Sequence, residues 1–439
     1  MKYAPGPLLT CLLVSLGLIL VSTPAARAQA VTSPRVVTVS PDGTGANFSN
    51  LRNAIDSITT ASASNPYVIL VYPGIYTGSL NTFLPWKSYV SLRGVDRYST
   101  IIRGTHPAQF DAIPLIDATM TQGVEISNIT LDGSQQFLDT LQYVSGGMGV
   151  CGAHITFTDV TYVTVDPNFT INSGNNYSGS PTCTTAGSVI VRNCDLGTVA
   201  DQGGDWLITN SWIHTTVSNP GDPGYGFVRT GSGSFPGTTT IIGSVLESTG
   251  TTANVGDIYP LLVTGNVPGE ARIVNSVIHA RSTSSAPNYD VAPVWPVGDG
   301  GPFVIEESTL IYESVSGATS GQFYGINAES LTLYPVVLRN SVIRSIGSGG
   351  TRADVRRESD GAPVTLAGVQ YSTVTGSGAS GITTLDFRQG QYSADLTIPL
   401  SNPTANANGR LFIGSSDRLC YRSGGEQRCV GGGLFMKVS

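Results

Sequence analysis

A six-residue pattern of apolar and polar positions recurs along most of the chain. Each copy contains an aliphatic residue, any residue, Asn or another turn former, a small residue, any residue and a second aliphatic residue, as in Ile273-Val-Asn275-Ser-Val-Ile278. The turn former stands at positions 94, 128, 159, 193, 210, 243, 275, 307, 340 and 368, mostly 28–34 residues apart. A near-constant step over 274 residues is typical of a stacked structural repeat.

The repeat unit is predicted to be a strand, a turn and a second strand. Its apolar residues are β-branched and alternate with polar ones, and no copy has a helical period. We expect the Asn to occupy the bend and to hydrogen-bond along the stack to the Asn above it. The small residue after it should point into a crowded corner, and the two aliphatic residues should face the core.

Successive copies are expected to pair in parallel, which satisfies the backbone groups of every coil except those at the two ends. The predicted fold class is all-β: a single-stranded right-handed parallel β-helix of about ten coils. A β-sandwich also has evenly spaced strands, but it does not repeat one six-residue motif at the same corner. Stretches rich in Gly, Pro and Ser, such as Ser282–Pro287 and Ser345–Gly350, are predicted to be loops.

Both ends of such a stack need a cap, because an open coil exposes an apolar cross-section. The spacing Leu51-x-x-Ala54-Ile55-x-x-Ile58 predicts a short helix over the N-terminal opening, with Asn47 and Ser49 as candidate N-caps. The repeat fades near residue 380, so we expect a β-helix domain at 31–385 and a small β unit at 386–439. That unit is a candidate cap, attachment module or homo-oligomerisation module.

The first thirty residues are predicted to be a cleaved export signal. Lys2 supplies a positive start, Leu8–Val21 form a short apolar segment, and Ala25-Ala-Arg-Ala28 ends in small residues. The apolar segment is too short for a membrane span, and no second stretch of spanning length follows. The mature protein is therefore expected to be secreted, outside the cell, at its surface or in the periplasm.

The charge of the chain disfavours two classes of binding partner. Only 12% of the residues are charged and the net charge is −7, which argues against nucleic acid and anionic membrane, since both reward clusters of Lys and Arg. The chain has four His and no Cys-x-x-Cys motif, so no zinc site and no cofactor are expected.

Five cysteines remain once the signal is removed, and in an exported protein some of them should be paired. Cys420 and Cys429 flank a hairpin-like segment and are expected to form a disulfide. At most one pair can form among the other three, Cys151, Cys183 and Cys194. Cys194 is interpreted as a small buried core residue.

The N-terminal segment carries a family resemblance. It reads Val39-Ser-Pro-Asp-Gly-Thr-Gly-Ala-Asn-Phe-Ser-Asn-Leu-Arg-Asn-Ala-Ile-Asp, then Tyr67-Val-Ile-Leu-Val-Tyr-Pro-Gly-Ile-Tyr76, Val90-Ser-Leu-Arg-Gly94 and Thr100-Ile-Ile-Arg-Gly104. Over about 70 residues this resembles the opening of pectin methylesterases and of the wider pectin-lyase-like β-helix superfamily. The resemblance implies a parallel β-helix and a polysaccharide partner, most directly a galacturonan-like glycan. The superfamily also includes lyases, hydrolases, phage tailspikes and inactive surface proteins, so the fold alone does not give the activity.

The resemblance also implies an esterase site, made of a nucleophilic carboxylate, a second carboxylate as acid/base, a Gln that holds the oxyanion and an orienting Arg. The family's Asp lies eight residues after a corner residue, and Asp201 keeps this offset from Asn193. The residues that best match the other roles are Asp166, Gln136 and Arg281. The family's Phe-Ile-Phe-Gly and Leu-Gly-Arg-Pro-Trp segments have no copy, which puts the activity in doubt.

Other interpretations remain open. Asp166 and Asp201 are also explained as turn residues on a solvent face, in a non-catalytic surface β-helix that binds a glycan. A polysaccharide lyase would need clustered acids, and a glycoside hydrolase could draw on Asp195, Asp201 and Asp205. The preferred substrate-binding surface is formed by Trp206, Trp212 and Tyr225, because exposed aromatic rings stack on sugars; burial under a loop is the alternative for these rings. A mixed-charge, solvated loop is expected around Arg352, Arg356 and Arg357.

Overall fold

The structure of the chain is a computed structural model. The described residues are 33–82, 84–104, 115–133, 148–163, 169–172, 185–229, 236–263, 269–297, 301–328, 335–359, 361–375, 382–385, 411–413, 419–423 and 426–429. The predicted signal at 1–30, Gln136, Asp166 and Cys183 lie outside them. Within the described part, no helix is both long and apolar enough to cross a membrane.

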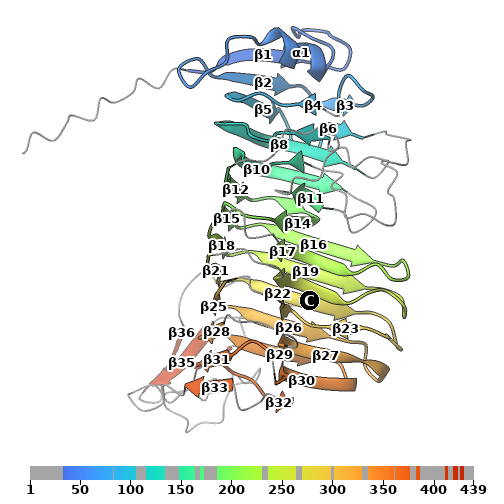
Figure 1. Ribbon diagram of the computed structural model, residues 1–439, viewed down its shortest axis with the longest axis vertical. Coiled ribbons are helices and arrows are strands. Elements are labelled where there is room, and N and C mark those ends of the chain that lie inside the picture. Colours follow the sequence, from blue (N-terminus) through green and yellow to red (C-terminus); the bar gives the residue numbers. More distant parts are fainter. Residues whose placement is uncertain are drawn as a thin grey trace, which may run out of the picture. The chain divides into compact units, whose positions relative to one another are not determined.

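The strands stack into two parallel sheets, and the larger sheet has 21 strands (Figure 1). The corner turns divide it into two walls. We call the strands before each corner wall 1: β1 (Arg35–Val39), β2 (Tyr67–Val71), β5 (Val90–Gly94), β8 (Val124–Asp132), β10 (His154–Val163), β12 (Ser188–Arg192), β15 (Asp205–Thr209), β18 (Thr239–Ile242), β21 (Ala271–Val274), β25 (Phe303–Glu306), β28 (Val336–Arg339), β31 (Val364–Ala367) and β33 (Ile382–Leu385).

Wall 2 follows the corners, and β8 and β10 run through the corner into it. Its own strands are β3 (Gly74–Tyr76), β6 (Thr100–Arg103), β13 (Asp195–Leu196), β16 (Trp212–Val217), β19 (Val245–Gly250), β22 (Val277–Ser282), β26 (Thr309–Glu313) and β29 (Val342–Ile346).

Wall 3 is the second sheet, with 12 strands. They are β4 (Leu84–Pro85), β7 (Ile116–Asp117), β9 (Met148–Gly149), β11 (Phe169–Asn172), β14 (Thr198–Asp201), β17 (Gly224–Arg229), β20 (Ile258–Val263), β23 (Asp290–Val291), β24 (Val294–Pro296), β27 (Ala318–Ala328), β30 (Gly349–Arg357) and β32 (Val374–Thr375). The predicted all-β parallel β-helix is confirmed by these stacked walls.

The corner between walls 1 and 2 has the same backbone conformation in coil after coil. Nine of the ten turn positions have φ between 48° and 62°: Asn128, Asp159, Asn193, Asn210, Gly243, Asn275, Glu307, Asn340 and Gly368. Asn and Gly tolerate this left-handed region, which explains their recurrence. Gly94 lies inside β5 instead, and a Cβ there would meet the carbonyl oxygen of Asn128.

Serine, not asparagine, forms the vertical hydrogen bonds at most of these corners. The backbone N–H groups of Cys194, Ser211, Ser244, Ser276 and Ser308 each donate to a serine Oγ in the next coil, at 3.1–3.2 Å. Each of these serines in turn donates to the carbonyl two residues before it, as Ser276 does to Val274. The expected Asn-to-Asn ladder is wrong: among the described corners, no asparagine side chain bonds to another.

One coil shows how little chain a complete turn needs. Strand β12 pairs with β15 in parallel, with Ser188 opposite Asp205, and the residues between them include β13 and β14. The hydrogen bond from Cys194 to Ser211 spans 17 positions, against 32 from Ser244 to Ser276. The additional residues of the longer coils therefore lie in the connections between walls.

The only helix in the described part is α1 (Leu51–Ser57), near the N-terminal end of the stack. Its N-cap is Asn50, whose side chain accepts from the N–H of Asn53, so the expected caps Asn47 and Ser49 are wrong by a few positions. Leu51, Ala54 and Ile55 are buried in the main core.

The C-terminal strands form a separate antiparallel sheet. It consists of β34 (Leu411–Ile413), β35 (Leu419–Ser423) and β36 (Glu426–Cys429). Cys420 and Cys429 are directly opposite each other in the β35–β36 ladder. The disulfide between them and the domain boundary at 385 stay predictions.

Candidate functional site

Asp201 lies at the end of β14 on wall 3 and has no solvent exposure. Its register partner in the next coil is Arg229, which is also fully buried, and the Nε of Arg229 is 3.6 Å from Oδ2 of Asp201. The hydroxyl of Thr239 donates to the same carboxylate at 2.5 Å, and the N–H of Gly203 donates at 2.8 Å. Asp201 is therefore committed to an internal polar cluster.

The electrostatics of this cluster follow from its burial. Desolvation raises the pKa of Asp201, against the opposing effect of Arg229 and of the two donated hydrogen bonds. Desolvation likewise lowers the pKa of Arg229. The expectation that Asp201 is a turn residue on a solvent face is wrong. A carboxylate without exposure also has no path to a polysaccharide, so this geometry does not support Asp201 as a nucleophile.

Of the other esterase candidates, the structure describes only Arg281, which lies on a different wall from Asp201. Arg281 is on β22 of wall 2, where its guanidinium pairs with Glu313 at 3.3 Å. Asp166 and Gln136 fall outside the described residues. The three acids considered for a glycoside hydrolase also separate: Asp195 lies on wall 2, Asp201 lies inside the coil, and Asp205 lies on wall 1 with Thr238 donating to it. They do not share one groove.

The three aromatic residues of the predicted binding surface lie on three different walls. Trp206, on β15, is only 2% exposed and packs edge-to-face on Phe227 in the core, so its predicted role in binding a substrate is wrong. Tyr225 is half-buried on β17 of wall 3. Trp212 is 44% exposed on β16 of wall 2, and of the three it is the ring that projects outward most.

Trp212 belongs to a polar patch on the outer face of wall 2. Its ring stacks on the imidazole of His214, with centroids 3.9 Å apart and planes 23° apart. The Nε2 of His214 is 2.8 Å from Oδ1 of Asp195, the residue opposite Trp212 in the preceding coil. Asp195 thus holds the imidazole, and the imidazole supports the indole.

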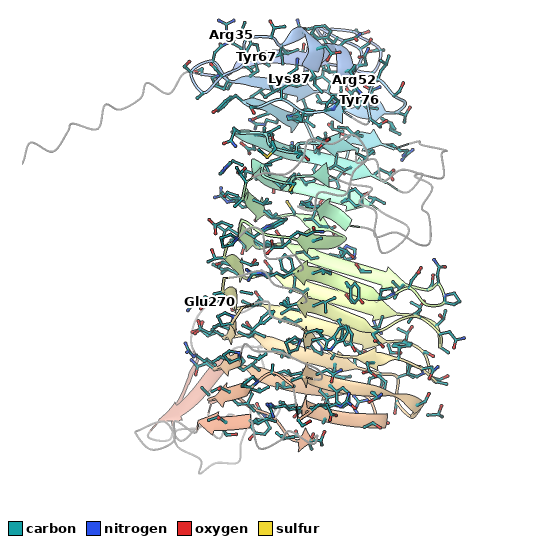
Figure 2. The ribbon with its side chains drawn as sticks, in the orientation of Figure 1. Arg35, Arg52, Tyr67, Tyr76, Lys87 and Glu270 are labelled. Atoms are coloured by element: carbon teal, nitrogen blue, oxygen red, sulfur yellow. The ribbon has the colours of Figure 1, made fainter. Side chains whose placement is uncertain are left out.

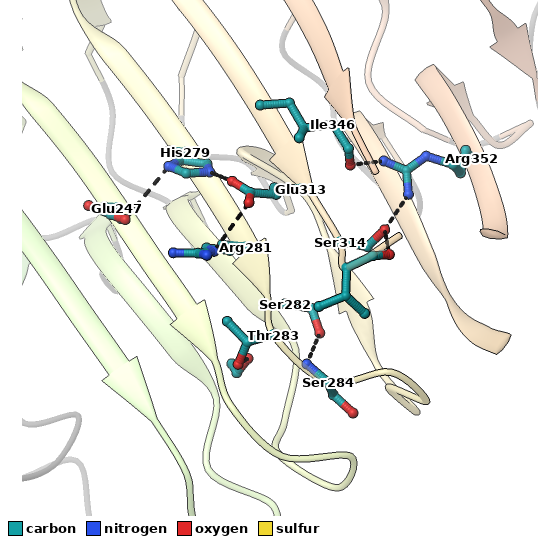
Figure 3. A network of polar contacts seen from close by, with 12 residues as sticks. Glu247, His279, Arg281, Ser282, Thr283, Ser284, Glu313, Ser314, Ile346 and Arg352 are labelled. Carbon is teal, nitrogen blue, oxygen red and sulfur yellow. Dashed lines mark hydrogen bonds and ion pairs between the residues drawn. The ribbon is translucent and has the colours of Figure 1, made fainter. Parts of the chain in front are cut away.

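The patch continues over the next coils (Figure 3). His279 lies between two carboxylates: its Nδ1 is 3.6 Å from Glu247, and its Nε2 is 2.9 Å from Glu313. Glu313 also pairs with Arg281, so Glu247, His279, Glu313 and Arg281 form one continuous polar network. His214, Glu247 and His279 are register partners in successive coils. We call Asp195, Trp212, His214, Glu247, His279, Arg281 and Glu313 the wall 2 patch.

Most members of the wall 2 patch were not predicted, although the sequence contains the signal. His214, Glu247 and His279 each stand four residues after a corner, and Arg281 and Glu313 each stand six after one. Even offsets after the corner point outward on wall 2, since the core residue stands at offset three. Aligning the repeats on their corners would have placed these residues in two adjacent columns.

The outer side of wall 3 is apolar and mostly buried. A second hydrophobic cluster there contains Tyr259 and Tyr324, with Tyr225 and Trp295 packed against it. The rings of Tyr259 and Trp295 are 4.2 Å apart. Nothing in the described part shows an open binding surface on this wall.

The expected mixed-charge loop near the C-terminal end is wrong. Arg352, Arg356 and Arg357 lie in strand β30, and Asp354 between them is buried and accepts from the hydroxyl of Tyr312 at 2.6 Å. Arg352 lies over the rings of Tyr312 and Phe323. These contacts connect β30 to β26 and β27 in the last coils of the stack. Among the residues that the structure describes, no group of three or more His, Cys, Asp or Glu side chains could hold a metal ion.

Comparisons with known proteins bear on the architecture. No family model matches the sequence, and no curated protein matches it. The parallel β-helix implied by the N-terminal resemblance is the fold observed. Solved structures with a similar fold include the A-module of the mannuronan C-5 epimerase AlgE4 of Azotobacter vinelandii, 14% identical, covering 80% of this chain and 98% of that one, with a TM-score of 0.40.

Two further structures show the range of activities found among such proteins. A pectin methylesterase variant in complex with a hexasaccharide is 13% identical, covers 63% of this chain and 90% of that one, and has a TM-score of 0.38. The surface adhesin PfbA of Streptococcus pneumoniae is 10% identical, covers 90% of this chain and 99% of that one, and has a TM-score of 0.32. Likenesses at this level assign no activity to the chain.

Proposed function

We propose that the protein binds a polysaccharide through the wall 2 patch and acts as a glycan-binding β-helix, not as an esterase built on Asp201. The observation that carries the proposal is Trp212, a large aromatic ring that is 44% exposed and held in place by His214 and Asp195. An indole presents a flat apolar face with little conformational entropy to lose, which suits it to stack on a sugar ring.

The rest of the patch suits a chain-like ligand. Carboxylates, imidazoles and one guanidinium follow one another along the stack, spaced by the separation of parallel strands, about 4.8 Å. A polysaccharide lying along the axis could therefore meet hydrogen-bonding groups in each successive coil. The N-terminal resemblance makes a galacturonan-like glycan the first ligand to test.

The test is retention on immobilised glycans, with polygalacturonate and methylated pectin as probes. Trp212→Ala should weaken binding about tenfold, the loss of roughly 1.4 kcal/mol that one stacking contact can supply. The matched control is Tyr98→Ala, which removes a ring that is 74% exposed outside the patch and should leave binding unchanged. Equal binding by wild type and Trp212→Ala, or loss in the control alone, would contradict the proposal.

The same preparation tests the esterase interpretation. Since Asp201 is buried and paired with Arg229, incubation with methylated pectin should release no methanol. Methanol release by wild type that disappears in Asp201→Asn, measured with the variant folded, would overturn the non-catalytic assignment.

We further propose that the chain is exported, with cleavage of residues 1–30, and that Cys420 and Cys429 form a disulfide. The support is the signal-like sequence and the opposite placement of the two cysteines in the ladder. N-terminal sequencing of the secreted protein should start near Gln29 or Val31. Peptide mapping without reductant should recover Cys420 and Cys429 in one linked species.

A further inference from the structure

A groove opens on the outer face of wall 1, over the first coils of the stack. It has a volume of about 640 Å³, within the range of small-ligand sites. Its lining includes Tyr67, Ser91, Arg93, Glu125 and Asp159, which come from the four successive strands β2, β5, β8 and β10. None of these residues belongs to the wall 2 patch.

The register of the strands explains why these side chains converge. Val68 is opposite Ser91 in the β2–β5 pair, and the N–H of Glu125 donates to the hydroxyl of Ser91 at 3.1 Å. In the neighbouring outward column, Arg93 is opposite Ser127 in the β5–β8 pair. Wall 1 therefore presents two adjacent columns of polar side chains to the groove.

An aromatic residue, Tyr67 at the start of β2, is among those that line the groove. Tyr67 lies beside Arg35 at the N-terminal end of the stack (Figure 2), with the guanidinium 5.8 Å from the ring centroid. Its hydroxyl also bonds to Thr60 at 2.9 Å, which fixes the ring. Tyr67, whose ring is half-buried against the hydrophobic core, thus lines the groove beside the polar columns.

The charged side chains of the groove are unpaired within the part of the chain that the structure describes. Within the described part of the chain, the side chains of Arg93, Glu125 and Asp159 form no ion pair or hydrogen bond with another residue. On wall 2, in contrast, Asp195, Glu247 and Glu313 are all engaged by imidazole or guanidinium groups. Uncommitted donors and acceptors around a fixed ring are the features of a site that recognises a polar ligand.

Further along the stack, the same two columns of wall 1 first become apolar. Beyond Glu125 and Thr156, the first column continues with Ile190 and Leu207. The second column becomes Ile242 and Val274 after Thr209. Charged residues return later in both columns as Arg272, Glu306 and Arg339, but there they form ion pairs with one another, unlike Arg93 and Glu125.

We propose that this groove is a second saccharide site, and that it takes a neutral pyranoside. Sugar hydroxyls can donate to Glu125 and Asp159 and accept from Arg93, while the apolar face of the ring packs on Tyr67. The three charged groups sum to −1, so a uronate would meet two carboxylates and a single cation. The two carboxylates of the groove have no cationic partner in the described part of the chain, whereas each carboxylate of the wall 2 patch contacts an imidazole or a guanidinium, so the galacturonan probe is assigned to wall 2 and the neutral one to the groove.

The experiment is calorimetric titration of the full chain with neutral hexasaccharides of glucose, galactose and mannose, and with hexagalacturonate as the acidic probe. At least one neutral hexasaccharide should bind. Glu125→Gln and Arg93→Met should each weaken that binding about tenfold, since each removes a charged hydrogen-bonding partner. Both side chains are exposed, so the thermal midpoints of the variants should match wild type.

Trp212→Ala separates the two sites, because it should leave binding of the neutral probe unchanged. Absence of binding by every neutral probe at about 5 mM, or neutral binding that neither groove variant alters, would overturn the groove proposal. Tighter binding of hexagalacturonate that depends on Arg93 would overturn the ligand class. Failure of the wall 2 patch would appear separately, as polygalacturonate retention that does not depend on Trp212.

Discussion

Replacing Arg229 with Met should destabilise the fold in a way that depends on pH. The substitution keeps an unbranched side chain but removes the only described cation paired with the buried carboxylate of Asp201. That carboxylate must then stay charged without a counter-ion or bind a proton. Proton uptake at pH 7 by a group with an ordinary pKa of 3.8 costs about 1.36 kcal/mol per pH unit, about 4 kcal/mol in all.

This cost sets the ceiling for the effect and agrees with the roughly 3–5 kcal/mol lost when one partner of a buried ion pair is removed. An unfolding entropy of about 2.1 cal/mol/K per residue over about 400 residues gives about 0.85 kcal/mol/K. The melting temperature at pH 7 should therefore fall by up to about 5 °C. Differential scanning calorimetry and circular dichroism would measure the shift.

The sign of the pH dependence follows from the raised pKa of Asp201. Burial favours the protonated form in the folded state, so the contribution of Asp201 to stability is present below its unfolded pKa, near 3.8. That contribution is lost as the pH rises through the folded pKa. Without Arg229 the folded pKa rises further, so the deficit should be largest at pH 8 and should shrink toward pH 5.

The control is the double variant Asp201→Asn/Arg229→Met. Asn can still accept from Gly203 and bond to Thr239, but neither charge remains, and neutral replacement of a buried ion pair is often tolerated. The double variant should be more stable than Arg229→Met at pH 8 and should lack its pH slope. A single variant as stable as wild type at pH 8, or one with a deficit independent of pH, would refute the reasoning.

Three further predictions concern the corners. Glu307 has φ of 50°, so Glu307→Asn should raise the free energy of unfolding by about 1 kcal/mol in urea titrations, and a decrease would contradict the strain argument. Ser276→Ala deprives the N–H of Ser244 of its acceptor and should cost about 1–3 kcal/mol by the same assay, with no loss counting against the serine ladder. Burial raises the pKa of Cys194 to about 11, so a thiol reagent at pH 8 should label it only after denaturation; rapid labelling of the native protein would disprove this.

The fold was predictable because one conformational constraint recurs at nine of the ten turn positions. A left-handed corner selects Asn or Gly, and the positions of Asn128, Asn193 and Asn275 reveal the coil spacing directly in the sequence. The burial of Trp206 was predictable by the same logic. It stands four residues before the corner at Asn210, and Ile208, two before that corner, faces the core. Alternation along a strand places both side chains on the inner face.

The inward direction of Asp201 was harder to predict. The eight-residue offset from Asn193 crosses a second bend, between β13 and β14, and a bend can reverse which side of the strand faces the core. The offset copied from the family therefore retained the residue type without its orientation. The pairing of Glu247 with His279 depends on contacts between coils, which no single repeat contains.

The short coil between Ser188 and Asp205 suggests how such a protein can diversify. A complete circuit closes with 17 positions, so the longer neighbouring coils carry chain beyond what winding requires. Selection can lengthen, trim or rewrite these surplus segments while the corner residues keep the rungs in register. A lineage could acquire new surface specificities in this way at little thermodynamic cost.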